Sequence, residues 1–348
     1  MIRHTLKSLS SIPAIGADMV IDVRAPCEFA EDHVPGAVNL PVLTDDERVY
    51  VGTIYAQQSP FLARKVGAAL VATNAARHLR GPLSEFQGDW QPLVYCWRGG
   101  QRSGAFATIL DQVGWRVHLI EGGYRSYRRH ISEMLYDVPL AHRIRLIDGC
   151  TGTAKTALLH RLRDAGAQIL DLEGLAAHRG SLFGGLDVTQ PSQKMFESRL
   201  ATALANLDPA RLTWVEGESS KIGVRMIPPA LWAAMRAAPR IEITAPVSAR
   251  AAFLATAYRD LTENPQVLIG LIGRLQGYHA TQTIAEWQAL ARAGQWESLA
   301  ARLMVEHYDA RYLKSQARAD QIPQQVSLAA LDPQTLAQTA KDLIVRFS

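Results

Sequence analysis

The chain has 348 residues, 48% of them hydrophobic and 20% charged, which excludes a disordered protein and favours two globular domains. It has three cysteines, no apolar run of about 18 residues and no signal-peptide core in residues 1–10, so we expect a cytoplasmic protein without a disulfide framework or a membrane span. The formal net charge of +4 is a weak sign of an anionic partner.

The first part of the chain alternates apolar segments with segments of helical periodicity. Residues 19–23, 93–95 and 117–120 are predicted to form buried strands, and residues 103–113 a helix with its apolar side chains on one face. Strands that alternate with helices indicate a parallel sheet in an α/β fold. We therefore expect a first α/β domain over residues 1–135.

The predicted strand at residues 93–95 ends at Cys96, and a turn rich in glycine and arginine leads from there into the next helix. Backbone N–H groups of such a turn point inward and the helix dipole adds positive potential, so the turn should bind an anion and favour the Cys96 thiolate. The residues expected to hold the anion are Arg98, Gly99, Gly100, Gln101, Arg102 and Ser103. The alternative is a buried structural cysteine.

Two families carry a cysteine loop of this kind on a parallel sheet. A resemblance to rhodanese-like sulfurtransferases, which hold sulfur on the cysteine, rests on Asp22-Val23-Arg24, Glu28-Phe29, His33-Val34-Pro35-Gly36-Ala37 and Asn39-Leu40-Pro41. The spacing from Cys96 to Arg102 is one residue longer than in most rhodaneses and is that of dual-specificity phosphatases, but Tyr95 stands where those phosphatases commonly have histidine. These features favour a carrier of sulfur or selenium whose donor also contains phosphate.

A second α/β unit is predicted from about residue 143. Its expected strands are residues 144–148, 168–171, 212–216 and 241–244, and the pattern is mainly helical from about residue 247 onward. We expect a P-loop NTPase-like α/β domain with a helical C-terminal part over residues 143–310. Residues 311–348 are expected to form a helical tail.

The turn after residues 144–148 matches a phosphate-binding loop with one departure. Residues 149–156, Gly-Cys-Thr-Gly-Thr-Ala-Lys-Thr, follow G-x-x-x-x-G-K-T except that Ala154 replaces the second glycine. In the usual arrangement Lys155 contacts the terminal phosphates and Thr156 a Mg²⁺ ion. The predicted phosphate-binding residues are Gly149, Thr151, Gly152, Thr153, Lys155 and Thr156.

Acidic residues at a second strand end would complete such a site. Glu216 and Glu218 are the first choice, with Asp171 and Glu173 as alternatives, and a structural salt bridge is the competing role for each. Mg²⁺ is compatible with this loop, but the sequence assigns no metal-ligand set.

The combination of the two loops resembles the tRNA 2-selenouridine synthases, over roughly residues 15–315. The resemblance rests on Tyr95–Ser103, Gly122–Arg125, Leu172–Leu175, Gln190–Lys194 and His307–Asp309, among other segments. It implies replacement of the sulfur of 2-thiouridine at the wobble position of tRNA by selenium from selenophosphate. The route implied runs through S-geranyl-2-thiouridine made with geranyl diphosphate.

The same resemblance implies roles for the two loops. Cys96 would carry the selenium while its loop holds the phosphate of selenophosphate, and residues 149–156 would hold the diphosphate of geranyl diphosphate. The protein would then be both a selenotransferase and a geranyltransferase. Its partners would be tRNA with 2-thiouridine at the wobble position and, as a further option, the enzyme that produces selenophosphate.

Binding of tRNA requires a basic surface with side chains that stack on bases. The candidates are Arg125, Arg128, Arg129, Arg179, Lys194 and Trp97, with solvated charge or core packing as the alternative for each. Apolar candidates to hold a prenyl chain are Leu182-Phe183, Met195-Phe196 and Trp232, for which core packing is again the alternative.

Two other functions fit parts of the sequence. One is a plain sulfurtransferase that takes sulfur from thiosulfate or a protein persulfide, with a regulatory phosphate loop. The other is a signalling module with a phosphatase-like first half and a nucleotide-driven switch. Tyr95 counts against the phosphatase, and Ala154 counts against the nucleotide switch.

Overall fold

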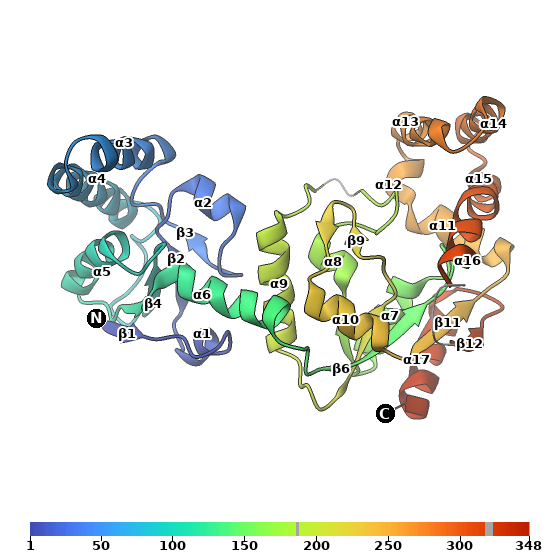
Figure 1. The fold of residues 1–348 in the computed structure, drawn as a ribbon, viewed down its shortest axis with the longest axis horizontal. Coiled ribbons are helices and arrows are strands. Elements are labelled where there is room, and N and C mark those ends of the chain that lie inside the picture. Colours follow the sequence, from blue (N-terminus) through green and yellow to red (C-terminus); the bar gives the residue numbers. More distant parts are fainter. Residues whose placement is uncertain (186–187, 317–322, 348) are drawn as a thin grey trace. The chain divides into compact units, whose positions relative to one another are not determined.

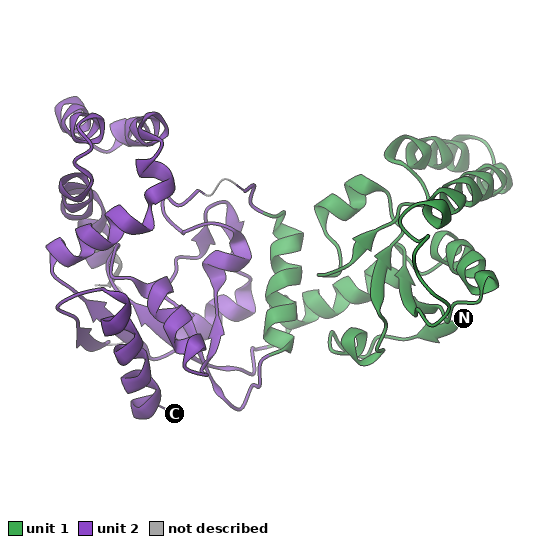
Figure 2. Ribbon diagram, turned by 180° about the vertical axis from the view of Figure 1, so that it is seen from behind, with its two compact units in different colours: residues 1–138, 191–206 green, residues 139–190, 207–348 purple. Residues whose placement is uncertain are grey.

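A computed structural model describes residues 1–185, 188–316 and 323–347 (Figure 1). The chain divides into two compact units, shown in different colours in Figure 2. Unit 1 comprises residues 1–138 and 191–206, and unit 2 comprises residues 139–190 and 207–348. Each unit has a parallel sheet with helices, which confirms the predicted α/β class.

The sheet of unit 1 is parallel throughout. Its strands, in their order across the sheet, are β1 (Ile2–His4), β5 (His118–Ile120), β4 (Pro92–Tyr95), β2 (Met19–Asp22) and β3 (Val38–Asn39). The helices are α1 (Ser11–Ala14), α2 (Pro26–Glu31), α3 (Asp45–Gln57), α4 (Pro60–Arg80), α5 (Gln101–Val113), α6 (Gly123–Ser132), η1 (Glu133–Asp137) and α9 (Gln193–Ala205). Every residue of β4 is buried, which is why this strand is a continuous apolar run.

The core of unit 1 joins the central strands to α5. Ile21 of β2, Val94 of β4 and Phe106 and Leu110 of α5 belong to one buried cluster. The three strands and the helix predicted in this part of the chain are therefore confirmed, with the helix beginning two residues earlier than expected, at Gln101.

Helix α9 belongs to unit 1 although it follows the P-loop in the sequence, so the units do not follow the expected boundaries. Its buried Glu197 forms an ion pair with Arg128 of α6 and accepts a hydrogen bond of 2.7 Å from the Tyr136 hydroxyl. Phe196 and Leu200 of the same helix are fully buried. A buried carboxylate is stable only when it is paired, and α6 and η1 provide the partners.

The sheet of unit 2 is also parallel. Its strands, in their order across the sheet, are β12 (Gln324–Ser327), β11 (Arg240–Thr244), β6 (Arg143–Asp148), β8 (Leu212–Glu216) and β7 (Gln168–Leu170). A short antiparallel pair is formed by β9 (Lys221–Ile222) and β10 (Arg225–Met226). Beside the sheet lie α7 (Lys155–Asp164), α8 (Leu172–Ala176), α10 (Pro229–Ala237) and α17 (Pro333–Phe347). The predicted strands and the helix after the P-loop are confirmed.

The helical part expected after residue 247 has a hydrophobic core of its own, which includes Ile272, Ile284, Trp287 and Leu299. Its helices are α11 (Val247–Ala257), α12 (Arg259–Thr262), α13 (Pro265–Gly273), η2 (Arg274–Gly277), α14 (Thr281–Arg292), α15 (Trp296–Leu303), η3 (Met304–Asp309) and α16 (Ala310–Gln316). Figure 1 shows α11 to α15 gathered at one side of unit 2.

The segment expected as a helical tail is part of the second sheet. Strand β12 pairs in parallel with β11, and Gln325 donates a 2.9 Å hydrogen bond to Glu242. Helix α17 does follow, and its Leu336, Ala340 and Leu343 pack in the cluster that contains Leu158 of α7. Residues 317–322 of the expected tail lie outside the described residues. Within the described ranges, no helix is long and apolar enough to cross a membrane.

Candidate functional site

The Cys96 loop follows β4 and is closed by the start of α6. The backbone N–H of Tyr124 donates to the Cys96 carbonyl at 2.8 Å. Gly99, at φ +65°, has no space for a side chain because a Cβ would lie 2.6 Å from the Ile120 carbonyl oxygen. Gly123, at φ +56°, lies so close to the Cys96 carbonyl that a Cβ would collide with it. Both glycines are thus required for the loop to pack against α6.

The loop offers free hydrogen-bond donors. Over residues 1–185, 188–316 and 323–347, no protein group accepts from the backbone N–H groups of residues 97–100. The first residues of α5 follow directly, and its N-cap, Gly100, has no side chain to satisfy them. Such N–H groups at a helix start form a site for an anion. The predicted anion cradle is therefore consistent with the backbone geometry.

The thiol of Cys96 lies at the bottom of this loop. Its side chain is 3% exposed, belongs to the unit 1 core cluster, and accepts a hydrogen bond of 3.1 Å from the Ser103 hydroxyl. This burial is the feature that the structural-cysteine alternative predicts. An atom bonded to Sγ would extend about 2 Å beyond it.

Arg102 is not a free cation. Its Nη1 lies 2.9 Å from Glu28 Oε2, and Arg48 Nε lies 3.1 Å from the same oxygen. Burial alone would raise the pKa of Glu28, but hydrogen bonding and charge from Arg102, with the charge of Arg48, lower it below its usual value. Arg98 and Gln101 are exposed. The loop thus carries one neutralised arginine and one arginine open to solvent.

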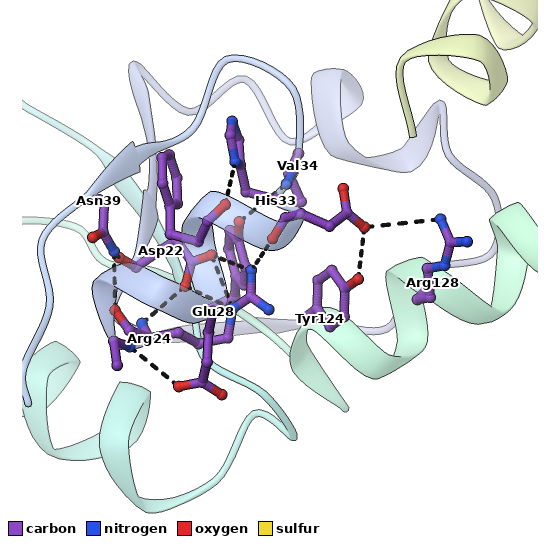
Figure 3. Close-up of polar contacts among 12 residues, drawn as sticks. Asp22, Arg24, Glu28, His33, Val34, Asn39, Tyr124 and Arg128 are labelled. Atoms are coloured by element: carbon purple, nitrogen blue, oxygen red, sulfur yellow. Dashed lines mark hydrogen bonds and ion pairs between the residues drawn. The ribbon is translucent and has the colours of Figure 1, made fainter. Parts of the chain in front are cut away.

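A buried polar network, drawn in Figure 3, supports the Cys96 loop. Arg24, 1% exposed, forms an ion pair of 2.6 Å with Asp22 and lies over the Tyr124 ring, 4.0 Å from its centroid. The Tyr124 hydroxyl donates to Asp32 at 2.6 Å, and Asn39 donates to the carbonyls of Asp22 and Arg24. Several of these residues belong to the rhodanese signature of the sequence. In the structure they hold β2, α2 and α6 together beside the loop.

The second loop, residues 149–156, has the P-loop backbone. Gly149 and Gly152 have positive φ, and Ala154 keeps the left-handed conformation at φ +60° although it is not glycine. Over the parts of the chain that the structure describes, the N–H groups of Gly152, Ala154 and Lys155 meet no acceptor. The Lys155 ammonium donates to the Gly149 carbonyl at 2.8 Å, which folds it over its own loop. Ala154 therefore costs strain, but it preserves the donor arrangement.

Thr156, the residue after the lysine, contacts two carboxyl groups. Its hydroxyl lies 2.9 Å from Glu173 and 2.8 Å from Glu216. One hydroxyl has a single proton to donate, so either the two carboxyl groups share it or one of them is protonated and donates to the hydroxyl. Oxygens of Glu173, Glu216 and Glu218 all lie within 4.8 Å of one another.

Burial raises the pKa of all three carboxyls. For Glu216 the second cause is the charge of Glu173, and for Glu173 it is the charge of Glu218. The pKa of Glu218 is raised to about 7 by burial and then by Glu216. Mg²⁺ binds oxygen ligands and would relieve this repulsion, so the donor set of Thr156 and the three carboxyls fits such an ion. Among the acidic candidates, Glu216 and Glu218 lie at this position and Glu173 joins them.

Asp171 lies apart from the acidic group. Its carboxylate caps α8 by accepting from the Gly174 N–H at 2.7 Å, and its other oxygen lies 2.7 Å from His160 Nε2. A helix cap with a histidine partner is a structural role. This is the alternative that the sequence analysis gave for this residue.

Arg250 was missed by the sequence analysis. It is 5% exposed, donates to the Thr151 carbonyl of the P-loop at 2.7 Å and forms a 2.6 Å ion pair with Asp309. It therefore ties the loop to η3. The resemblance had pointed to His307–Asp309, but nothing in the local sequence of α11 marks Arg250.

The P-loop opens into a cavity with about 1170 Å³ of empty space, part of it open to solvent. Lys155, Thr156, Glu173 and Glu218 line it together with Arg179. Positive and acidic groups thus face one space, as binding of a phosphate with a divalent cation requires.

The basic candidates for tRNA binding divide into two sets. Arg128, Lys194 and Arg179 form ion pairs with Glu197, Glu31 and Asp260, respectively. Arg125 and Arg129 of α6 are exposed. Trp97 is half-buried, with its ring 5.2 Å from that of Tyr124. The first three are held by protein carboxylates, so the exposed arginines of α6 are better placed to meet a phosphate backbone.

The fold and the two loops define a protein that joins a rhodanese-like domain to a P-loop domain. A rhodanese-like domain family matches residues 5–130, and the family described as tRNA 2-selenouridine synthase AAA domain matches residues 142–283. The chain belongs to the tRNA 2-selenouridine synthase family.

Curated relatives support this assignment. The tRNA 2-selenouridine synthase of Nitrosomonas europaea is 37% identical over 235 residues, 66% of this chain, and the chain spans only 61% of its length. That of Psychromonas ingrahamii is 34% identical over 261 residues, covering 74% of this chain and 70% of the relative. A crystal structure of a rhodanese-related protein from Thermoplasma volcanium matches with a TM-score of 0.24 and 20% identity, over 37% of this chain and 92% of that one.

Proposed function

We propose that this protein is a tRNA-modifying enzyme that converts 2-thiouridine at the wobble position of tRNA into 2-selenouridine. The observation that carries the proposal is the presence, in one chain of this family, of two loops with free backbone donors, one at Cys96 and one at Lys155. The names of the relatives state the same product. The aligned part covers 61% of the first relative, so the activity of the whole protein is a proposal here.

The P-loop is proposed to hold the diphosphate of geranyl diphosphate. A thiocarbonyl sulfur is a poor leaving group, and S-geranylation turns it into a thiolate-type leaving group while making C2 of the base electrophilic. Lys155 and the free N–H groups would stabilise the charge on the departing diphosphate. Thr156, Glu173, Glu216 and Glu218 would hold Mg²⁺, which supplies further charge stabilisation to the diphosphate.

Cys96 is proposed to act on selenophosphate as the nucleophile that makes its selenium available for tRNA, with the phosphate held by the free N–H groups of residues 97–100. Electron balance restricts how this occurs. Formation of an S–Se bond with release of phosphate removes two electrons, so this route needs an electron acceptor. Attack of the Cys96 thiolate on phosphorus instead forms a phosphocysteine and frees selenide, with no change of oxidation state. The phosphatase-like spacing from Cys96 to Arg102 is compatible with this second route.

The test of the function is a nucleoside analysis with purified protein. tRNA that carries 2-thiouridine is incubated with geranyl diphosphate, selenophosphate and Mg²⁺, and its nucleosides are separated by mass spectrometry. We expect S-geranyl-2-thiouridine with geranyl diphosphate alone, and 2-selenouridine when selenophosphate is also present. Lys155→Ala should block the first step. Sulfur transfer from thiosulfate without any change in tRNA would instead support the plain sulfurtransferase.

The same samples identify the chemistry at Cys96. A selenium adduct has the isotope pattern of selenium in the peptide that contains Cys96, whereas a phosphate adduct of similar nominal mass does not. Detection of either on Cys96 supports its role at selenophosphate. Turnover with neither adduct, and with Cys96 replaced, would remove the residue from the reaction.

A further inference from the structure

A second cavity in unit 2 lies next to the P-loop and is lined mainly by apolar side chains. It has about 590 Å³ of empty space, part of it open to solvent. Leu261 of α12, Leu268 of α13 and Trp296 and Leu299 of α15 contribute to its wall. Phe183, one of the apolar candidates from the sequence, also lines it.

The apolar cavity adjoins the P-loop cavity. Five residues line both spaces, namely Thr151, Ser181, Leu254, Tyr258 and Tyr308. The loop itself packs on this wall, since a Cβ at Gly152 would lie 2.9 Å from Leu254 Cδ1. A ligand whose anionic group is held by the loop therefore has an apolar space directly beside it.

The boundary between the two spaces carries a buried polar group. The hydroxyl of Tyr308 is buried and makes no hydrogen bond of ordinary geometry in the described part of the chain, although the Ser181 side chain lies close enough to act on it as a weak partner. A buried donor that is only weakly paired is costly, and a phosphate oxygen at this boundary would pair it better. The shape and chemistry thus match a molecule with an anionic head and an apolar chain.

We propose that the apolar cavity binds the prenyl chain of the diphosphate substrate, with the diphosphate on the P-loop. The proposal rests on the proposed function, which assigns geranyl diphosphate to that loop. Burial of the chain against leucine and aromatic side chains provides binding free energy that inorganic diphosphate lacks. The wall formed by α12, α13 and α15 limits the length of chain that fits.

The experiment fills the cavity from two sides. Ala300 of α15 and Ala255 of α11 are half-buried and line it, so Ala300→Phe and Ala255→Phe place a ring in the space of the chain. Ala252→Phe, at an exposed position of α11 outside the lining, is the matched control. Affinities for geranyl diphosphate, dimethylallyl diphosphate and inorganic diphosphate are measured by titration calorimetry with the whole chain.

We expect each filling variant to lose at least about tenfold in affinity for geranyl diphosphate and to keep its affinity for inorganic diphosphate within about twofold. Dimethylallyl diphosphate, with its shorter chain, should be affected less, and the control should behave as the wild type. An equal loss for all three ligands, or no loss for geranyl diphosphate, would overturn the proposal.

The wild-type protein provides a measurement that does not depend on the variants. It should bind geranyl diphosphate at least about tenfold more tightly than inorganic diphosphate, and equal affinities would refute the cavity as the prenyl site. Failure of the proposed function looks different. In that case the wild type binds prenyl diphosphates with this selectivity but transfers no geranyl group to tRNA. If both filling variants transfer the geranyl group and bind geranyl diphosphate as the wild type does, the prenyl chain does not lie in this cavity, and the proposed function is unaffected.

Discussion

At the scale of single residues, Cys96 is the position on which the proposed chemistry depends most. Its thiol is buried and held by Ser103, yet the loop above it has donors for which the described residues offer no acceptor. A structural cysteine would not require those free donors. A cysteine that reacts with selenophosphate requires them, because the phosphate must be bound beside the sulfur.

Replacement of Cys96 by serine should separate the two proposed steps. Cys96→Ser keeps the size and hydrogen-bonding capacity of the side chain but removes the nucleophile, so selenation should fall by more than about a hundredfold while S-geranylation is retained. Cys27→Ser, at an exposed free cysteine of α2, is the control and should leave both steps unchanged. The measurement is the nucleoside analysis of modified tRNA. Undiminished selenation by Cys96→Ser would rule out Cys96 as the residue that reacts with selenophosphate.

The residue scale also shows what local sequence can predict. Cys96, Lys155 and Thr156 were found because glycine-rich turns between a strand and a helix have recognisable spacing. Glu173 could be named only as one of several acidic alternatives, because its approach to Glu216 depends on how β8 and α8 pack. Arg250 gave no signal, since its partners are 99 and 59 residues away in the sequence.

At the scale of elements, α11 and η3 hold the P-loop through Arg250. Removal of one partner of a buried ion pair leaves the other charge unpaired and costs about 3–5 kcal/mol. Arg250→Met should therefore lower the free energy of unfolding of unit 2 by about this amount and weaken diphosphate binding, because Thr151 loses its anchor. Urea unfolding followed by tryptophan fluorescence measures the first effect.

Arg302 of α15 provides the matched control. It forms ion pairs with Glu286 and Glu306 but is 34% exposed, and exposed pairs contribute up to about 1 kcal/mol. Arg302→Met should thus have a much smaller effect on unfolding than Arg250→Met. Equal effects of the two substitutions would show that Arg250 does not anchor the loop.

The acidic group between α8 and the end of β8 should make stability depend on pH. Glu218 has a folded-state pKa of about 7, above the ordinary value of about 4.3, so the folded protein binds more protons than the unfolded one between these values. Stability from this group is full below about pH 4.3 and is lost as pH rises through about 7. Mg²⁺ should offset the loss, since the ionised carboxylates can then bind the ion.

The check is the thermal midpoint of unfolding from pH 5 to pH 8, with and without Mg²⁺. Glu218→Gln should reduce the fall of the thermal midpoint with rising pH, and it should reduce the rise in the midpoint that Mg²⁺ produces. Glu297→Gln, at an exposed position of α15, should retain both. The assignment fails if Glu218→Gln and the wild type show the same pH dependence.

Among the elements, those with a regular apolar pattern were predicted well, and those defined by distant partners were not. Strand β4 is a buried apolar run, and β6 and β8 combine buried apolar residues with a carboxyl residue at their ends, so all three can be recognised in the sequence alone. Strand β12 has only one half-buried apolar residue, Val326, and its pairing with β11 comes from its position at the sheet edge. The prediction of a helical tail left out β12, because the alternation of apolar and polar residues that marks a strand is lacking there.

At the scale of the whole molecule, the chain crosses between its two units more than once. Helix α9 returns to unit 1 after the P-loop, where its buried Glu197 pairs with Arg128 and Tyr136 of that unit. The placement of α9 in unit 1 depends on the charge and burial of residues far apart in the sequence. A prediction that divides the chain into contiguous domains could not include it.

A fragment test follows from the position of α9. Residues 1–138 alone should be less stable than residues 1–138 joined to residues 191–206 by a glycine–serine linker. Helix α9 contacts α6 and η1, whose Tyr127, Ile131 and Leu135 are buried in the complete unit. Loss of this apolar contact and of the pairing of Arg128 with Glu197 should cost several kcal/mol, enough to lower the thermal midpoint by more than about 10 °C.

The control for this comparison keeps the length but removes the buried contacts. The joined fragment with Phe196→Ala and Leu200→Ala should lose most of the gain, since both side chains are fully buried. Circular dichroism at the same protein concentration measures the midpoints. Equal midpoints for residues 1–138 and for the joined fragment would mean that α9 does not stabilise unit 1, and the two-unit division of the chain would then have to follow its sequence order.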